Sequence, residues 1–166
     1  DLVILGNLYL ELNQPSKALT SFNQSIEVID KSNLPQAVKV NGHTTHLFNL
    51  SRVFAVQGEI EKAKETSDLF AEQVGIRNNP IQVKLIAQLK GIIAMHEGNY
   101  QTAITEFQEA NQLNPYNLFR IGQAYDALGE NEKAASYILR AEELNVLNSM
   151  DQAVVLSKTK FLKSPS

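Results

Sequence analysis

The sequence has 166 residues, of which 43% are hydrophobic and 20% are charged, so it is long enough for one globular domain or a short repeat array. Its formal net charge of −3 and the lack of any block of five like charges disfavour nucleic-acid binding. The absence of cysteine excludes a disulfide framework and a cysteine-based zinc site. No apolar run approaches the length of about 18 residues that favours membrane insertion. We therefore expect a soluble segment of a longer or processed protein, with a cytoplasmic location favoured over a periplasmic one.

Four helix-turn-helix units are predicted in succession, near residues 1–34, 35–77, 78–114 and 115–148. In each unit a small residue is followed twelve positions later by alanine. The four pairs are Gly6 with Ala18, Ser51 with Ala63, Gly91 with Ala103, and Gly122 with Ala134. Five residues before each alanine lies a residue that accepts the left-handed conformation ending a helix, namely Asn13, Gly58, Gly98 and Gly129. Internal repetition of this kind determines the whole fold.

The spacing between units is uneven. Successive small residues are 45, 40 and 31 positions apart, and few helix breakers occupy the longer intervals, so longer than usual helices are predicted in the first half. A final helix is predicted over 149–162. It begins with a capping box of Ser149 and Gln152, and Met150, Val154 and Phe161 fall on one face. We expect this helix to cap the open end of the array, and residues 163–166 to form a tail.

The units resemble the tetratricopeptide repeat (TPR) family over residues 1–148. The first unit reads Leu2-x-x-Leu5-Gly6-x-x-Tyr9 and then Ala18-x-x-x-Phe22, the third has Ala103-x-x-x-Phe107, and the fourth has Leu118-x-x-Ile121-Gly122-x-x-Tyr125. Leu2, Leu47, Ala87 and Leu118 replace the signature tryptophan. The resemblance implies an all-α fold, a right-handed α-solenoid of about four helix-turn-helix units with a C-terminal capping helix.

Close helix packing explains the pattern, because small residues let two helix axes approach and aromatic residues fill the space beside them. The predicted packing residues are Gly6, Ala18, Phe22, Ala63, Gly91, Ala103, Phe107, Gly122 and Ala134.

Nothing in the sequence predicts an enzyme. His43 and His46 share a helical spacing, but two ligands are too few for a zinc site. His96 and Glu97 precede a turn, and no oriented partner or substrate cleft accompanies them. Phosphate-binding, nucleophile-elbow and metalloprotease motifs do not occur. We therefore expect no catalytic residue, no metal and no cofactor.

In the TPR family the first helix of each unit lines a concave groove, where peptides or partner helices bind. The candidate groove residues are Asn7, Phe48, Asn49, Arg52, Leu89, Ile92, His96, Phe119, Arg120 and Gln123. One subgroup holds the C-terminal carboxylate of chaperone peptides with asparagines and three cations. Asn7 and Asn49 match the asparagines, but Val3, Leu85 and Leu89 occupy the cation positions, so capture of such a tail is not expected.

The sequence therefore predicts a protein-protein interaction scaffold that binds an amphipathic or apolar segment, without catalysis. The alternative is a regulatory or sensor segment of a multidomain protein, in which another domain or a ligand fills the groove. The identity of the partner and the oligomeric state stay open.

Overall fold

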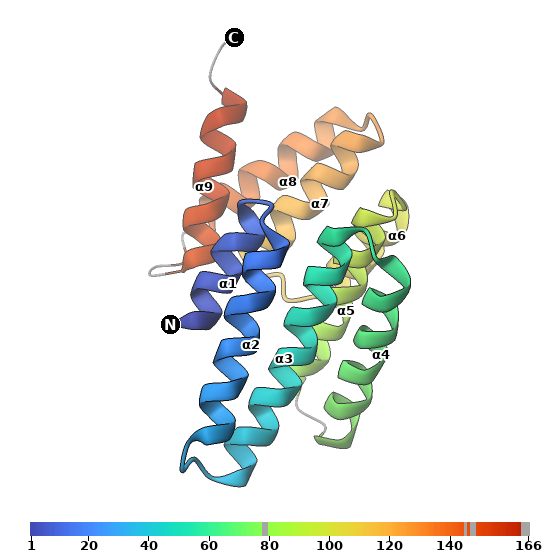
Figure 1. The fold of residues 1–166 in the computed structure, drawn as a ribbon. Coiled ribbons are helices and arrows are strands. Elements are labelled where there is room, and N and C mark those ends of the chain that lie inside the picture. The colour runs from blue at the N-terminus through green and yellow to red at the C-terminus, as the bar shows by residue number, and fades with distance from the viewer. Residues whose placement is uncertain (78–79, 145, 147–148, 164–166) are drawn as a thin grey trace.

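A computed structural model describes residues 1–77, 80–144, 146 and 149–163, and their regular structure is helical throughout (Figure 1). The helices are α1 (Leu2–Glu11), α2 (Pro15–Lys31), α3 (Gln36–Gln57), α4 (Ile60–Arg77), α5 (Pro80–His96), α6 (Tyr100–Glu109), α7 (Pro115–Ala127), α8 (Asn131–Glu143) and α9 (Met150–Lys163). Among them, none combines the length and the apolar character needed to cross a membrane.

Tight turns join α1 to α2, α3 to α4, α5 to α6, and α7 to α8. Each turn contains one residue with positive φ, and these are Asn13 (54°), Gly58 (77°), Gly98 (76°) and Gly129 (76°). The predicted left-handed turn residues are thus confirmed. A glycine adopts this conformation without the steric penalty that a Cβ atom imposes.

The four helix pairs stack in order along the chain. Each helix packs against the next one, from α1 against α2 to α7 against α8, and α9 lies against both α7 and α8 (Figure 1). The predicted all-α solenoid is therefore confirmed. The longer helices of the first half are also confirmed, because α2, α3 and α4 have 17, 22 and 18 residues while α6, α7 and α8 have 10, 13 and 13. The unit boundaries stay predictions, and residues 78 and 148 lie outside the described residues.

Small residues lie where paired helices come closest. A Cβ atom added to Gly6 would lie 2.4 Å from the Phe22 ring, and one added to Gly91 would lie 2.8 Å from the Phe107 ring. In the second pair a buried hydrogen bond occupies this place, since the Ser51 hydroxyl donates to the carbonyl oxygen of Ala63 at 2.7 Å. On the second helices, Ala18, Ala63, Ala103 and Ala134 are buried.

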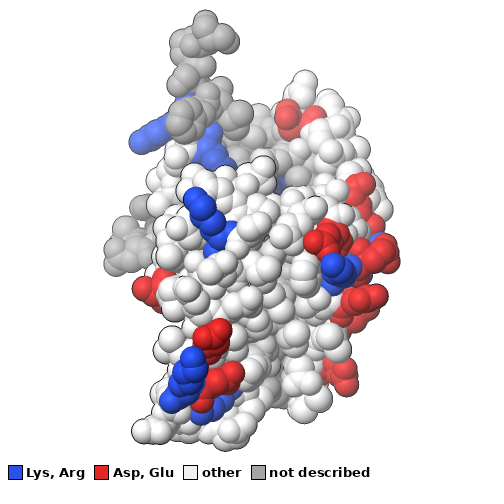
Figure 2. Space-filling model, viewed as in Figure 1, with Lys and Arg blue, Asp and Glu red and all other residues white. Residues whose placement is uncertain are grey.

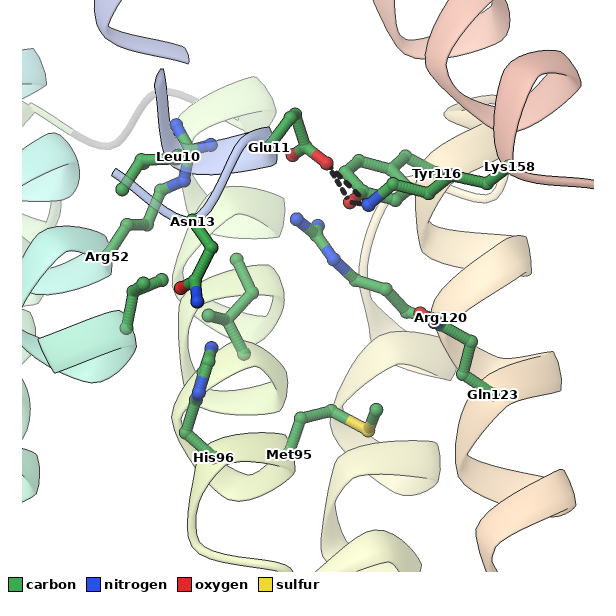
Figure 3. Close-up of a pocket in the computed structure, with 12 residues that line it drawn as sticks. Leu10, Glu11, Asn13, Arg52, Met95, His96, Tyr116, Arg120, Gln123 and Lys158 are labelled. Atoms are coloured by element: carbon green, nitrogen blue, oxygen red, sulfur yellow. Dashed lines mark hydrogen bonds and ion pairs between the residues drawn. The ribbon is translucent and has the colours of Figure 1, made fainter. Parts of the chain in front are cut away.

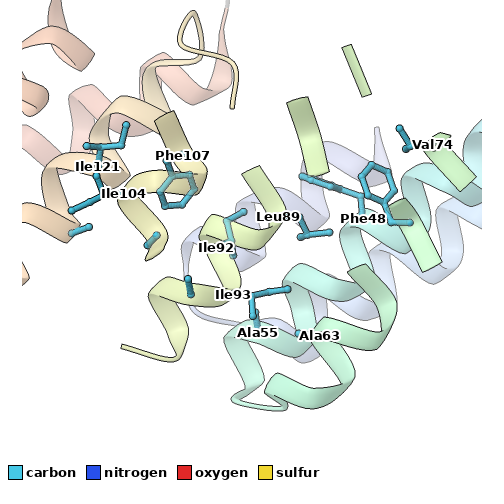
Figure 4. Packing of buried hydrophobic residues seen from close by; sticks show 14 residues of the cluster. Phe48, Ala55, Ala63, Val74, Leu89, Ile92, Ile93, Ile104, Phe107 and Ile121 are labelled. Carbon is cyan, nitrogen blue, oxygen red and sulfur yellow. The ribbon is translucent and has the colours of Figure 1, made fainter. Parts of the chain in front are cut away.

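The largest hydrophobic cluster runs through the middle of the stack (Figure 4). It joins Phe48 of α3 and Phe70 of α4 to Leu89 of α5, Phe107 of α6 and Ile121 of α7. The Phe48 and Phe70 rings lie 5.5 Å apart between centroids, in a tilted arrangement. Because one core spans α3 to α7, these helices are held together and fix the positions of the side chains on their surface.

The terminal helix α9 packs on the last helix pair, but its first turn differs from the predicted capping box. Ser149 accepts a hydrogen bond from the Gln152 backbone N–H at 3.3 Å, as expected for a helix start. The Gln152 side chain does not complete a capping box, because its amide donates to the carbonyl oxygens of Ala141 and Glu142 at the end of α8. Residues 164–166 of the predicted tail and the side chain of Phe161 lie outside the described part of the chain.

Charged side chains on the face shown in Figure 2 gather mainly at its edges. Acidic residues predominate along the edge formed by α4 and α6. There Lys64 lies 2.6 Å from Glu97 and 3.6 Å from Glu61, measured between the ammonium nitrogen and the carboxylate oxygens. Exposed pairs of this kind stabilise a protein only weakly because solvent screens them, so they do not determine the fold.

Candidate partner-binding site

A pocket of about 280 Å³ lies on the face formed by α1, α3, α5, α7 and α9, which we call the inner face (Figure 3). Five of the predicted groove residues line it, namely Arg52, Ile92, His96, Arg120 and Gln123. Seven further residues complete the lining, namely Leu10, Glu11, Asn13, Val56, Met95, Tyr116 and Lys158. The pocket therefore combines contributions from all four helix pairs and from the terminal helix.

A network of three polar side chains joins distant parts of the chain at one wall of this pocket (Figure 3). The Lys158 ammonium group of α9 donates to the Glu11 carboxylate of α1 and to the Tyr116 hydroxyl of α7, both at 2.6 Å. The Tyr116 hydroxyl in turn donates to Glu11. These contacts link the first helix to the last across the inner face.

The network changes the protonation behaviour of its members. Burial by itself would raise the pKa of Glu11, but the hydrogen bonds from Lys158 and Tyr116 outweigh burial and lower that pKa. Burial would lower the pKa of Lys158, and the contact with Glu11 reverses the effect and raises it. Burial raises the pKa of Tyr116. Near neutral pH, Glu11 is therefore an ionised carboxylate and Lys158 an ammonium group, and the neutral Tyr116 phenol bridges them.

Arg52 of α3 is one of two arginines that line the pocket. Its guanidinium group donates to the side-chain oxygens of Asn7, at 2.7 Å, and Asn49, at 3.4 Å, and lies 5.5 Å from the centre of the Phe48 ring. Burial, reinforced by the charge of Arg120, lowers the pKa of Arg52 to about 10. The two asparagines that match the chaperone-peptide clamp are therefore occupied by an arginine of the protein itself.

Arg120 is the second arginine of the pocket. Its guanidinium carbon lies 4.0 Å from the centre of the Tyr116 ring, a distance that allows a cation–π contact. The side chain is half-buried and points from α7 toward Glu11 and Tyr116 (Figure 3). Among the described residues it makes no ion pair within 4.0 Å and donates no hydrogen bond.

The structure corrects the assignment of several groove residues. Leu89 and Phe119 are 0% and 1% exposed, so the prediction that they face a partner is wrong. Leu89 lies in the central core because α5 packs against α3 as well as α4 and α6, and Phe119 packs against Tyr116 beside α9. Phe48, Asn49 and Ile92 are also largely buried and offer only small parts of their side chains.

A second pocket adjoins the first one on the inner face. Both pockets share Glu11, Arg52, Tyr116 and Arg120, and the second also contains Asp151 of α9. Asn7 and Phe48 line this second pocket, whereas Asn49 lines a different one near α2. The shared polar side chains thus form a partition between two neighbouring hollows.

The histidines lie in different surroundings in the described part of the chain. His43 lies 2.8 Å from Asp30 between nitrogen and oxygen, but both side chains are about half exposed. Within the described residues no group of three or more His, Cys, Asp or Glu side chains is arranged to hold a metal ion. Burial, and secondarily the charge of Arg120, lowers the pKa of His96. A neutral imidazole at the pocket rim can donate or accept one hydrogen bond.

Glu11, Tyr116 and Lys158 were not predicted as site residues. Tyr116 and Lys158 are separated from Glu11 by 105 and 147 positions. No local spacing in the sequence connects such residues, since their proximity depends on how far the stacked helices curve.

The stacked helix pairs and the left-handed turns define a helical-repeat protein that is similar to the tetratricopeptide class. A family model described as tetratricopeptide repeat matches residues 2–31. This class generally serves as a scaffold for protein interactions and is generally non-catalytic. A second model, described as regulator of microtubule dynamics protein 1-3, matches residues 79–165, which is more than half of the chain. The chain therefore belongs to the regulator of microtubule dynamics protein 1-3 family. A comparison with curated proteins finds no match.

Proposed function

We propose that the chain holds a peptide or helix of a partner protein on its inner face and has no catalytic activity. The observation that carries this proposal is the pocket to which α1, α3, α5, α7 and α9 all contribute side chains. Ligand sites in helical arrays are generally built between helices in this way. The apolar side chains of Leu10, Val56, Ile92 and Met95 lie in the same pocket as the polar network, so both kinds of side chain of an amphipathic segment would find a counterpart.

The proposal is tested by selecting ligands from a displayed library of random short peptides. The wild-type chain is expected to enrich peptides that bind on the inner face. Met95→Glu places a charge among the apolar lining residues and should abolish binding of the selected peptides, measured by fluorescence polarisation. Leu139→Glu is the matched control, because Leu139 lies on α8 and is already 50% exposed. Equal loss of binding in both variants, or no enrichment by the wild type, would contradict the proposal.

The alternative is that another domain or a ligand occupies this face as part of a regulatory or sensor protein. The two alternatives are distinguished by measuring peptide binding to a longer protein that includes adjoining sequence from the same gene. An intramolecular occupant should block the selected peptides in the longer protein, and Met95→Glu should not restore their binding. Undiminished peptide binding by the longer protein would favour the scaffold.

A role in microtubule dynamics is a second candidate, and the family match favours it. The match over residues 79–165 includes Arg120 and Lys158, which line the pocket together with Arg52. Co-sedimentation with assembled microtubules tests this candidate. Pelleting of the wild type that Arg120→Gln reduces would support it, and a wild type that stays in the supernatant would contradict it.

A further inference from the structure

The side chains that line the two inner-face pockets carry more positive than negative charge among the described residues. Among the described residues that line the two pockets, the cations are Arg52, Arg120 and Lys158, and the carboxylates are Glu11 in the shared partition and Asp151 in the second pocket. Three positive charges against two negative ones leave one positive charge unbalanced. This local excess contrasts with the net charge of −3 of the whole chain.

The unbalanced charge is best assigned to the arginines. Lys158 is paired with Glu11 at 2.6 Å. Arg52 is held by the neutral amides of Asn7 and Asn49, and Arg120 lies over the Tyr116 ring without a hydrogen bond to any described residue. A guanidinium group carries five N–H donors in a planar fork that matches a carboxylate. Because Arg120 is half-buried and donates no hydrogen bond to any described residue, its N–H groups can bind an acceptor from another molecule.

We propose that this pocket binds one carboxylate, supplied by an Asp or Glu side chain within the bound segment of a partner, with Arg120 as its main ligand. A single carboxylate would neutralise the excess charge, whereas a phosphate dianion would exceed it. Leu10, Ile92 and Met95 line the same pocket, so apolar residues flanking the acidic one would be covered. The inference rests on the proposed scaffold function and deepens it, because it specifies the chemistry of the partner.

The test uses the displayed peptide library with every peptide joined to its carrier through its C terminus, so that no free terminal carboxylate is present. The selected peptides should share one Asp or Glu next to apolar residues. Exchange of that residue for Asn or Gln in a synthetic peptide should weaken binding to the wild type by about tenfold, the value of one charge-assisted hydrogen bond. The same exchange should have little effect on binding to Arg120→Gln, since the two changes remove the same contact.

Two further variants make the result specific. Lys158→Gln removes a second cation and should also weaken binding of the acidic peptide. It serves as the test variant if Arg120→Gln proves poorly folded. Arg140→Gln is the matched control, because Arg140 is exposed on α8 and stacks on Tyr137 at 4.7 Å. It should leave binding unchanged.

The other outcomes overturn the inference in distinguishable ways. Selected peptides without a shared acidic residue would contradict the carboxylate pocket and leave the scaffold function standing. Enrichment only from a second library with free C termini would assign the pocket to a terminal carboxylate. Tighter binding of inorganic phosphate than of acetate would make it a phosphate site. Failure to select any peptide would overturn the scaffold function and this inference together.

Discussion

At the scale of single residues, Gly122 and Gly75 show how the surroundings of a glycine decide its effect on stability. A Cβ atom on Gly122 would lie 2.7 Å from the Ile138 side chain and 3.2 Å from the backbone oxygen of Ala134, whereas one on Gly75 would meet nothing within 4 Å. We predict that Gly122→Ala lowers the free energy of unfolding by about 1–3 kcal/mol, because α7 and α8 must separate. Gly75→Ala should raise it by about 0.5–1 kcal/mol, because alanine favours the helix. Urea unfolding of both variants measures the difference, and a shift of the same sign in both would contradict the packing explanation.

At the scale of elements, Gln152 joins the start of α9 to the end of α8. Gln152 is buried, donates to the carbonyl oxygens of Ala141 and Glu142 at 3.1 and 3.2 Å, and accepts from the Val146 backbone N–H at 3.3 Å. Gln152→Met keeps the size but removes these three hydrogen bonds, so we predict that the free energy of unfolding falls by about 1–3 kcal/mol. Amide hydrogen exchange should accelerate in α9 and the last turn of α8. Ala153→Met, at an exposed position of the same helix, is the control and should show exchange rates like those of the wild type.

The helices themselves could be predicted from the sequence because their signals are local. The interval between a small residue and alanine fixes each helix pair, and the turn residues Asn13, Gly58, Gly98 and Gly129 mark its middle. The partner of the Gln152 side chain could not be predicted in this way. A capping box and a contact with the preceding helix use the same residue types, and only the approach of α8 to α9 decides between them.

At the scale of the whole molecule, the inner-face site depends on contacts that the sequence pattern does not contain. Arg52, Ile92, His96, Arg120 and Gln123 were predicted because each lies on the first helix of a unit, and the pocket brings these five together. Leu89 and Phe119 occupy similar positions but are buried, since the repeat pattern does not specify how tightly successive first helices pack. Glu11 and Lys158 meet only because the stack brings its two ends together.

The pH dependence of stability reports on these tertiary surroundings. Burial, and secondarily the charge of His43, lowers the pKa of His46 below its usual 6.5. On acidification, His46 therefore takes up its proton at a higher pH in the unfolded chain than in the folded chain. The stability that neutral His46 contributes above about pH 6.5 is lost as the pH falls. The pKa of Glu11 is also lowered, from an ordinary 4.5, so its contribution is lost at still lower pH. The two groups thus act in successive pH ranges.

We predict that the free energy of unfolding decreases in two stages on acidification. His46→Gln should flatten the profile between about pH 7 and 5, because an uncharged side chain takes up no proton there. Glu11→Gln should lower stability at pH 7, where it removes the ionised partner of Lys158, and should flatten the profile below pH 4.5. Urea unfolding at closely spaced pH values measures both effects. If Glu11→Gln left the acid limb as steep as in the wild type, the bridge from α1 to α7 and α9 would not contribute to stability in solution, and the two ends of the array would be held by packing against their neighbouring helices.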